Sequence, residues 1–241
     1  MNGMTVLAID TTGPDGGVAV CRDGVAVSLV RNTRPANIYS VSLFEMVEHA
    51  LIEASIGFGD VNLFAAANGP GSFTGIRVGL AAVQGWSKAF GRPARGVSVL
   101  EAMVETAQPR TNLAIALLDA RRGEFFLNIF RRAQSVDLSL GLYQPAQDGW
   151  ALEPHAIRDL AEKMSPTEIA SLTWVVRESD LAAASLRKTL SLPGQWRTIR
   201  EPLMVAIARI GQRALTQEPD LNQPLDALYI RASDAELHWR G

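Results

Sequence analysis

Apolar residues at the start of the chain change from a strand pattern to a helical one. Residues 5–10, 17–21 and 25–30 form short apolar runs that predict three strands. The Asp23-Gly24 pair between the last two runs is typical of a tight hairpin. Apolar side chains at helical spacing then predict a helix over residues 37–54.

Strands and helices alternate in the next segment. A compact apolar run at 63–67 predicts a buried strand, and a glycine-rich loop at 69–75 leads into a helix that ends near Gly91. A short strand at 96–97 precedes the Ser98-to-Glu101 spacing of a capping box, which opens a third helix. The predicted order is therefore β-β-β-α-β-α-β-α.

The same order begins again in the second half. Residues 113–119 predict a strand that ends in aspartate, and 124–130 alternate as its hairpin partner. Further on, 154–164 predict a helix, 172–176 a strand and 202–215 a last helix. The second half is less regular than the first, so its boundaries are less well defined.

The repeated order predicts an α/β protein with two ribonuclease H-like lobes, the architecture of actin, the sugar kinases and the Hsp70 ATPase. We expect the first lobe over residues 1–109 and a degenerate second lobe over 110–241, with the last helix packing back on the first lobe. Fold order alone does not establish function.

Composition narrows the classes of function. The formal net charge is -2 and the pI is near 6.0, so the chain as a whole has no attraction to nucleic acid. No apolar run reaches the length of a membrane span, and we expect a cytoplasmic protein. The single cysteine, Cys21, lies in an apolar run and is predicted to be a buried core residue rather than a reactive thiol.

Two turns could approach a phosphate in a two-lobed protein of this class. Asp10 ends the first strand, where it could face a ligand or cap the following turn. Its counterpart at 119–123 carries two arginines where close approach of a phosphate would favour glycine. The glycine loop could bind an anion or form a tight connection with Ser72 or Thr74 as N-cap. The weak anion-site candidates are Asp10, Gly69, Gly71, Ser72, Thr74 and Gly75.

Residues for catalysis by a metal or a nucleophile are scarce. His49, His155 and His238 are the only histidines, and no two of them have the H-x-x-x-H spacing. The chain has no C-x-x-C and no G-x-S-x-G motif. We therefore predict no catalytic residue and no metal site.

The two helices that flank the glycine loop carry apolar residues on more than one side. One side can pack on a sheet, and the other needs a second chain or another part of this chain to cover it. We predict that residues 38–54 and 74–90 form a docking surface. The chosen interface residues are Leu43, Met46, Val47, Ala50, Gly79, Ala82, Val83 and Trp86.

Several segments in order resemble the bacterial TsaB (YeaZ) family. The specific signal is the long run GPGSFTGIRVGL at 69–80, and weaker signals are LAIDTT at 7–12, GVSVLEA at 96–102, DARRGE at 119–124 and LYIR at 228–231. Tyr39-Ser40 departs from the His-Ser pair with which many relatives open the first long helix. The detailed partner contacts of that helix are therefore the least transferable part.

The resemblance implies a non-catalytic scaffold in the formation of threonylcarbamoyladenosine beside the anticodon of tRNA. The family pairs with the transferase TsaD through the first-lobe helices, is assisted by the ATPase TsaE, and can form homodimers through much the same surface. The resemblance implies contact with tRNA only through the complex. We expect no cofactor, and a nucleotide only at an interface shared with the partner.

Two other readings remain open from the residues. A catalytic nucleotide-binding phosphotransferase or ATPase of the same fold would use Asp10 and the glycine loop. A glycoprotease-like metallopeptidase would need a metal site, for which the sequence offers no spaced ligands. Binding of ATP with magnesium would favour the first, and a bound metal would favour the second.

Overall fold

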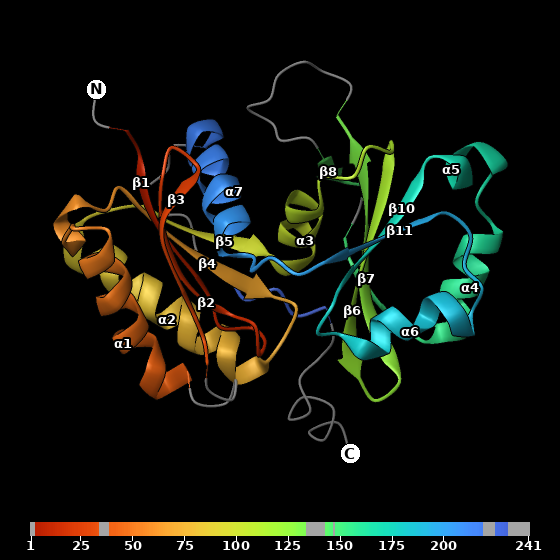
Figure 1. Cartoon of the computed structure of the whole chain (residues 1–241), viewed down its shortest axis with the longest axis horizontal. Coiled ribbons are helices and arrows are strands. Elements are labelled where there is room, and N and C mark those ends of the chain that lie inside the picture. The colour runs from red at the N-terminus through yellow and green to blue at the C-terminus, as the bar shows by residue number, and fades with distance from the viewer. Residues whose placement is uncertain (1–2, 34–38, 134–142, 147, 219–224, 231–241) are drawn as a thin grey trace. The chain divides into compact units, whose positions relative to one another are not determined.

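The computed structural model describes residues 3–33, 39–133, 143–146, 148–218 and 225–230 (Figure 1). The chain forms two compact units, each made of two stretches of sequence. Unit 1 comprises residues 1–102 and 202–228, and unit 2 comprises residues 103–201 and 229–241. The predicted boundary lay after residue 109. The observed boundary after residue 102 falls within a helix at 99–107, and residues 202–228 belong to the first unit.

Unit 1 contains a five-stranded sheet in the order β3-β2-β1-β4-β5. The first three strands are antiparallel neighbours, whereas β4 and β5 continue from β1 in parallel. Their bounds are β1 Thr5–Asp10, β2 Gly17–Arg22, β3 Val25–Arg31, β4 Leu63–Gly69 and β5 Ala94–Ser98. All six residues of β1 are buried, as expected for a central strand covered on both faces.

Helices cover both faces of this sheet. Phe64 and Ala66 belong to the core cluster formed with α1 and α2, while a Cβ at Gly211 of α7 would meet Ala65 at 3.1 Å. Alternate residues of β4 therefore face opposite helical layers. The helices of unit 1 are α1 Tyr39–Glu53, α2 Phe73–Phe90, α7 Met204–Gln217 and the short 3-10 turn η2 Phe58–Asp60, and α3 Val99–Ala107 follows β5.

Helix α7 is held on the sheet by a buried cation. Arg95 of β5 is 3% exposed and donates hydrogen bonds to the carbonyl oxygens of Ala94 and Glu218. Glu218 is the C-cap of α7, so the guanidinium contacts the end of the helix where backbone carbonyls carry partial negative charge. The last helix thus packs on the sheet of unit 1, against β1, β2, β4 and β5.

Unit 2 repeats the strand order of unit 1. Its sheet has the order β11-β10-β6-β7-β8, with β6, β7 and β8 antiparallel and β10 and β11 parallel to β6. The strand β9 pairs with β7 off this path. The bounds are β6 Leu113–Arg121, β7 Glu124–Arg132, β8 Tyr143–Pro145, β9 Trp150–Leu152, β10 Leu172–Arg177 and β11 Gln195–Ile199.

The helices of unit 2 are shorter and contribute less to its core. The core cluster joins Ile157 of α4 and Leu186 of α6 to Trp174 of β10, whose indole N–H donates to the carbonyl oxygen of Pro193. Proline is the first residue of α4 and of α5, and Asp180 is the N-cap of α6, as expected at helix N-termini. The bounds are α4 Pro154–Glu162, α5 Pro166–Ala170 and α6 Leu181–Thr189.

The predicted fold class is confirmed. Each unit has the ribonuclease H-like order of an antiparallel three-stranded part continued by two parallel strands. The sequence did not predict β8, β9, β11, α5 or α6. The predicted start of the first helix at residue 37 lies outside the described residues, and Tyr39 is the first described residue of α1. None of the helices described is both long and apolar enough to cross a bilayer.

Candidate functional site

Asp10 binds the turn that follows it. Its side chain is fully buried at the end of β1, and Oδ1 accepts the backbone N–H of Thr12 at 2.9 Å and the hydroxyl of Thr12 at 2.6 Å. This is the Asx-type turn in which an aspartate at a strand end satisfies the backbone two residues on. The carboxylate therefore has the turn-capping role that the sequence left open.

The glycine loop packs against the same turn. A Cβ at Gly75 would overlap the carbonyl oxygen of Thr11, and one at Gly79 would lie 2.5 Å from Thr11 Oγ1. The Thr11 hydroxyl donates to the carbonyl oxygen of Gly75 at 2.6 Å. The start of α2 therefore approaches the turn so closely that only glycine fits at these two positions.

Ser72 is also bonded within the chain. The backbone N–H of Ser72 donates to the carbonyl oxygen of Thr12 at 2.8 Å, and Ser72 Oγ accepts the N–H of Gly75 at 3.2 Å as the N-cap of α2. Gly69 is covered by the backbone of Leu228, whose N–H donates to Asn68. Of the predicted anion-site residues, Gly71, Ser72 and Thr74 are exposed. The contacts give this loop a packing role.

The counterpart turn in unit 2 uses a different partner. Asp119 Oδ1 accepts the backbone N–H of Arg121 at 2.7 Å, and the N–H of Asp119 donates to Oδ2 of Asp180 at the same distance. Asp180 is also the N-cap of α6, where its Oδ1 accepts the N–H of Ala183. Two carboxylates thus lie at this turn, an arrangement that does not favour a phosphate.

The residues predicted to dock a partner are mostly core residues of unit 1. Leu43, Val47 and Ala50 of α1 are at most 2% exposed, and on α2 only Ala82 is half-buried while the others are buried. They pack on the sheet and between the two helices. The prediction placed these residues on an exposed docking face, and the structure places them in the interior of unit 1. The residues concerned are Leu43, Met46, Val47, Ala50, Gly79, Val83 and Trp86.

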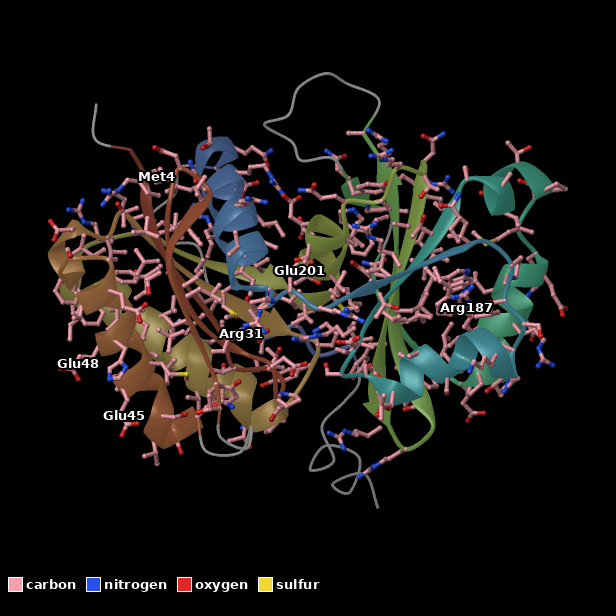
Figure 2. All side chains as sticks on the ribbon, viewed as in Figure 1. Met4, Arg31, Glu45, Glu48, Arg187 and Glu201 are labelled. Carbon is pink, nitrogen blue, oxygen red and sulfur yellow. The ribbon has the colours of Figure 1, made fainter. Side chains whose placement is uncertain are left out.

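Another set of apolar side chains on α1 is exposed. Val41 is 59%, Phe44 58% and Ile52 67% exposed. Glu45 and Glu48 lie among them on the same side of the helix, which Figure 2 shows directed away from the sheet. We call these five residues the α1 outer face. The rings of Phe44 and Trp86 of α2 pack edge to face, with their centroids 6.1 Å apart. The α1 outer face therefore lies next to α2.

Cys21, His49 and His155 are not grouped with other potential metal ligands in the described part of the chain. Burial raises the pKa of the Cys21 thiol to about 11, against a smaller opposite effect of Arg209, so the thiol is protonated and inert as predicted. His49 and His155 are exposed, and His238 lies outside the described residues. Among the described residues no three potential ligands form a group that could hold a metal ion.

Sequence comparison relates the chain to proteins of one tRNA modification. Residues 35–141 match the family model described as TsaD, tRNA N6-adenosine threonylcarbamoyltransferase. The TsaB protein of Escherichia coli, named for tRNA threonylcarbamoyladenosine biosynthesis, is 29% identical over 164 residues, which cover 67% of this chain and 68% of the relative. The Bacillus subtilis TsaB protein is 28% identical over 53% of this chain and 56% of its own length. The chain is thus similar to TsaB (YeaZ) proteins in sequence.

Structural comparison agrees with this family at the level of the fold. YeaZ from Pseudomonas aeruginosa superposes with a TM-score of 0.73 and 22% sequence identity, over 94% of this chain and 99% of the other. The two chains therefore share a fold. The sequence matches with the curated relatives are shorter, spanning about two thirds of the E. coli protein and little more than half of the B. subtilis protein.

Proposed function

We propose that this protein takes part in forming threonylcarbamoyladenosine in tRNA as the partner subunit of a TsaD-type transferase. The observation that carries this proposal is the similarity to curated TsaB proteins, which are named for that biosynthesis. The match of residues 35–141 to the TsaD model supports a paralogous relationship with the transferase. Pairs of paralogous subunits commonly associate through equivalent surfaces.

We propose further that the subunit is not itself the catalyst. The side chain that would face a ligand in an active relative, Asp10, accepts two hydrogen bonds from Thr12. The glycine loop packs on the same turn, and its N-cap serine bonds within the loop. These contacts support a structural use of the region, with any nucleotide held at an interface shared with the partner.

The α1 outer face is the surface that we propose for docking. Val41, Phe44 and Ile52 are exposed to solvent, and their removal from water would favour association by roughly 25 cal/mol for each Å² of apolar surface buried. Phe44 is a suitable anchor, because aromatic side chains near the centre of an interface contribute much of the binding energy. Glu45 and Glu48 would complement basic residues of the partner.

The same surface could serve a second copy of this chain, so we propose that homodimer and heterodimer compete for it. A TsaE-type ATPase is the further protein partner that we propose, with tRNA contacted through the complex. The net charge of -2 agrees with indirect contact, since this chain alone carries no excess of positive charge. This role would place the protein in the cytoplasm, where tRNA is modified.

A matched pair of valine variants tests the docking surface. Val41→Asp on α1 and Val25→Asp on β3 each place a charge at an exposed valine, 59% and 65% exposed respectively. We expect Val41→Asp to reduce co-purification with the TsaD-type protein of the same organism at least about tenfold, because a buried unpaired charge is costly. Val25→Asp should pair normally. Equal pairing by both variants would contradict the placement on α1.

Reconstitution of the modification tests the function itself. We expect the TsaD-type protein to form threonylcarbamoyladenosine efficiently only when this chain is present. The chain alone should hydrolyse no ATP in the presence of magnesium. Hydrolysis of ATP by the isolated chain would instead support the phosphotransferase reading, and unchanged modification without the chain would contradict the proposed role.

A further inference from the structure

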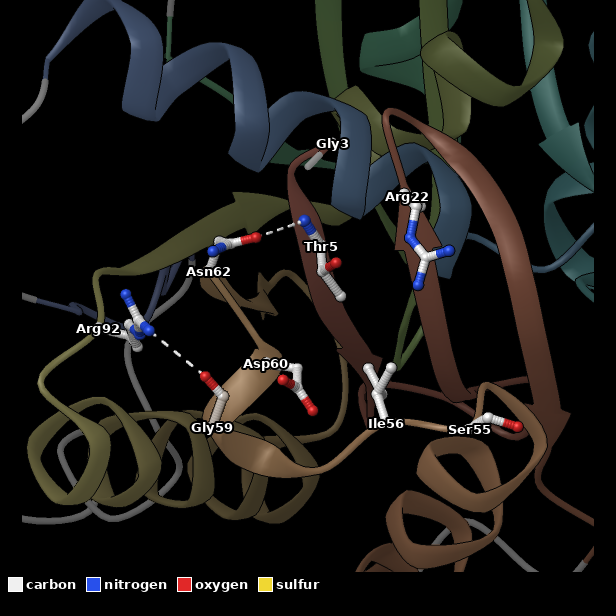
Figure 3. A pocket seen from close by; sticks show the side chains of 9 residues that line it. All are labelled: Gly3, Thr5, Arg22, Ser55, Ile56, Gly59, Asp60, Asn62 and Arg92. Carbon is white, nitrogen blue, oxygen red and sulfur yellow. Dashed lines mark hydrogen bonds between the residues drawn. The ribbon is translucent and has the colours of Figure 1, made fainter. Parts of the chain in front are cut away.

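Figure 3 shows a pocket of about 680 Å³ in unit 1. It lies at the ends of the sheet strands that are opposite to Asp10. Thr5 begins β1, Asn62 directly precedes β4 and Arg22 ends the antiparallel β2, so all three lie at the same end of these strands. Asp10 and the glycine loop mark the opposite ends of β1 and β4. The pocket is therefore separate from the turns that could approach a nucleotide in an active relative. Its volume is typical of small-molecule sites, which span about 300–1,000 Å³.

The walls of the pocket are rich in hydrogen-bond donors. The side chain of Arg22 makes no hydrogen bond or ion pair with any residue that the structure describes, which leaves its guanidinium available. Arg92 uses one N–H on the carbonyl oxygen of Gly59 at 3.3 Å. The Asn62 amide oxygen accepts the N–H of Thr5 at 2.8 Å, and its NH₂ group lies on the side of the amide away from Thr5, as Figure 3 shows. Two cations and an amide donor favour a ligand with negatively charged oxygens.

One acceptor lies among these donors. Asp60 Oδ2 accepts the N–H of Gly57 at 2.9 Å, and no described residue donates to Oδ1. The end of α1 beside the pocket is closed within the chain, since Ser55 and Ile56 donate to the carbonyl oxygens of Ile52 and Leu51. Its terminal carbonyls therefore do not add strongly to the negative charge of Asp60. The acceptor suits a hydroxyl group on the body of the ligand.

We propose that this pocket binds a small phosphate-bearing molecule with a free hydroxyl pair, of the class of a nucleoside monophosphate. Arg22 binds the phosphate with its planar guanidinium, Asp60 accepts from the hydroxyls and Ile56 supplies an apolar contact. The site does not depend on the proposed pairing with a TsaD-type protein, because all its residues belong to unit 1 and none of them is part of the α1 outer face.

The phosphate could come from a free nucleotide or from an RNA chain, and the volume of the pocket, which suits a small molecule, favours the free nucleotide. The test is a titration of the full-length ¹⁵N-labelled protein with AMP, inorganic phosphate, 2′,3′-dideoxy-AMP and a short single-stranded oligoribonucleotide, followed by NMR. We expect AMP to shift the signals of the Asn62 amide and of Gly57 and Gly59 at millimolar concentrations. The dideoxy analogue and inorganic phosphate should bind more weakly than AMP.

Two arginine variants locate the contact. Arg22→Gln should weaken AMP binding about tenfold, because a hydrogen bond to a charged group is lost. Arg31→Gln changes an exposed arginine on the neighbouring strand β3 that does not line the pocket, and it should leave binding unchanged. Equal affinity of both variants, shifts elsewhere, or no shift with AMP would overturn the proposal. Shifts of the pocket signals by the oligoribonucleotide alone would overturn the small-molecule source.

Discussion

The two units begin alike and differ at the turn after their first strand. In both, an aspartate at the end of that strand accepts the backbone N–H two residues on, from Thr12 in unit 1 and from Arg121 in unit 2. In unit 1 the backbone of α2 packs directly on this turn, whereas in unit 2 the Asp180 carboxylate bonds to it. One strand order thus accommodates two ways of joining the turn to the following helix.

Close packing alone accounts for the glycines at 75 and 79 of unit 1, so no bound ligand is needed to explain them. Direct packing of helix on turn leaves no room for a side chain at Gly75 or Gly79. In unit 2 the contact with the turn is made by the Asp180 side chain, and no glycine stands at the start of α6. The glycine-rich segment at 69–79 therefore has a packing role in this chain.

The largest expected effect is on the packing in unit 1. Gly75→Ala should lower the free energy of unfolding by about 3 kcal/mol, because its Cβ would overlap the backbone of Thr11. Gly85→Ala on the same helix has open space and should raise it by about 0.5 kcal/mol. Urea unfolding followed by circular dichroism measures both. Similar values for the two variants would show that the close approach at Gly75 is not limiting.

A smaller effect is expected from the carboxylate in unit 2. Asp180→Ala removes the acceptor of the Asp119 N–H and the N-cap of α6, which should cost about 2 kcal/mol. The exposed Asp159 on α4 provides the control, and Asp159→Ala should change stability by less than about 0.5 kcal/mol. Labelling of Cys21, which lies in unit 1, should keep its rate in both variants. Faster labelling in Asp180→Ala would mean that the two units do not unfold separately.

Cys21 also makes the stability of unit 1 depend on pH. Its pKa is raised from 9.0 to about 11 in the folded state, so the stabilisation is complete below pH 9 and is lost as the pH rises toward 11. The free energy of unfolding should fall by roughly 1.4 kcal/mol between neutral pH and pH 10 through this group. Cys21→Ala should lack this component. Identical alkaline profiles of the two proteins, measured by urea unfolding, would contradict it.

The smallest effect concerns the hairpins. The β2–β3 hairpin turns through Asp23 and Gly24, which suit positive φ, and the β6–β7 hairpin turns through Arg122 and Gly123. In the second hairpin Arg121, the last residue of β6, also has a positive φ of 65°. Arg121→Asn should raise the melting temperature slightly, corresponding to about 0.5 kcal/mol, because asparagine tolerates the left-handed region. Arg121→Lys should give no gain. A gain from lysine would show that removal of the guanidinium, and not relief of the backbone, is responsible.

The sequence predicted the fold well where strands are buried and continuous. The strands of unit 1 and the β6–β7 hairpin match, because their apolar runs are long and bounded by turn residues. The strands β8 and β9 have three residues each, and β11 is mostly exposed, so none has a hydrophobic period to detect. Helix α6 had a recognisable signal in its N-cap, Asp180.

The candidate sites were less predictable for a geometric reason. Leu43 and Phe44 are adjacent apolar residues on α1, yet one is fully buried and the other 58% exposed. A helix that is apolar on several sides does not reveal from its sequence which side meets the sheet. The pocket combines Arg22, Asp60 and Arg92 from three distant segments, and no spacing along the chain relates them.

The return of α7 to the first sheet has a consequence for synthesis on the ribosome. Residues 1–102 emerge first, but the helix that covers one face of their sheet comes from residues 204–217. At a synthesis rate of roughly 5–20 residues per second, that face of the sheet stays uncovered for several seconds or more. A nascent chain stalled before residue 204 should therefore expose the apolar face of this sheet and bind chaperones. A chain from which α7 has emerged from the ribosome should not.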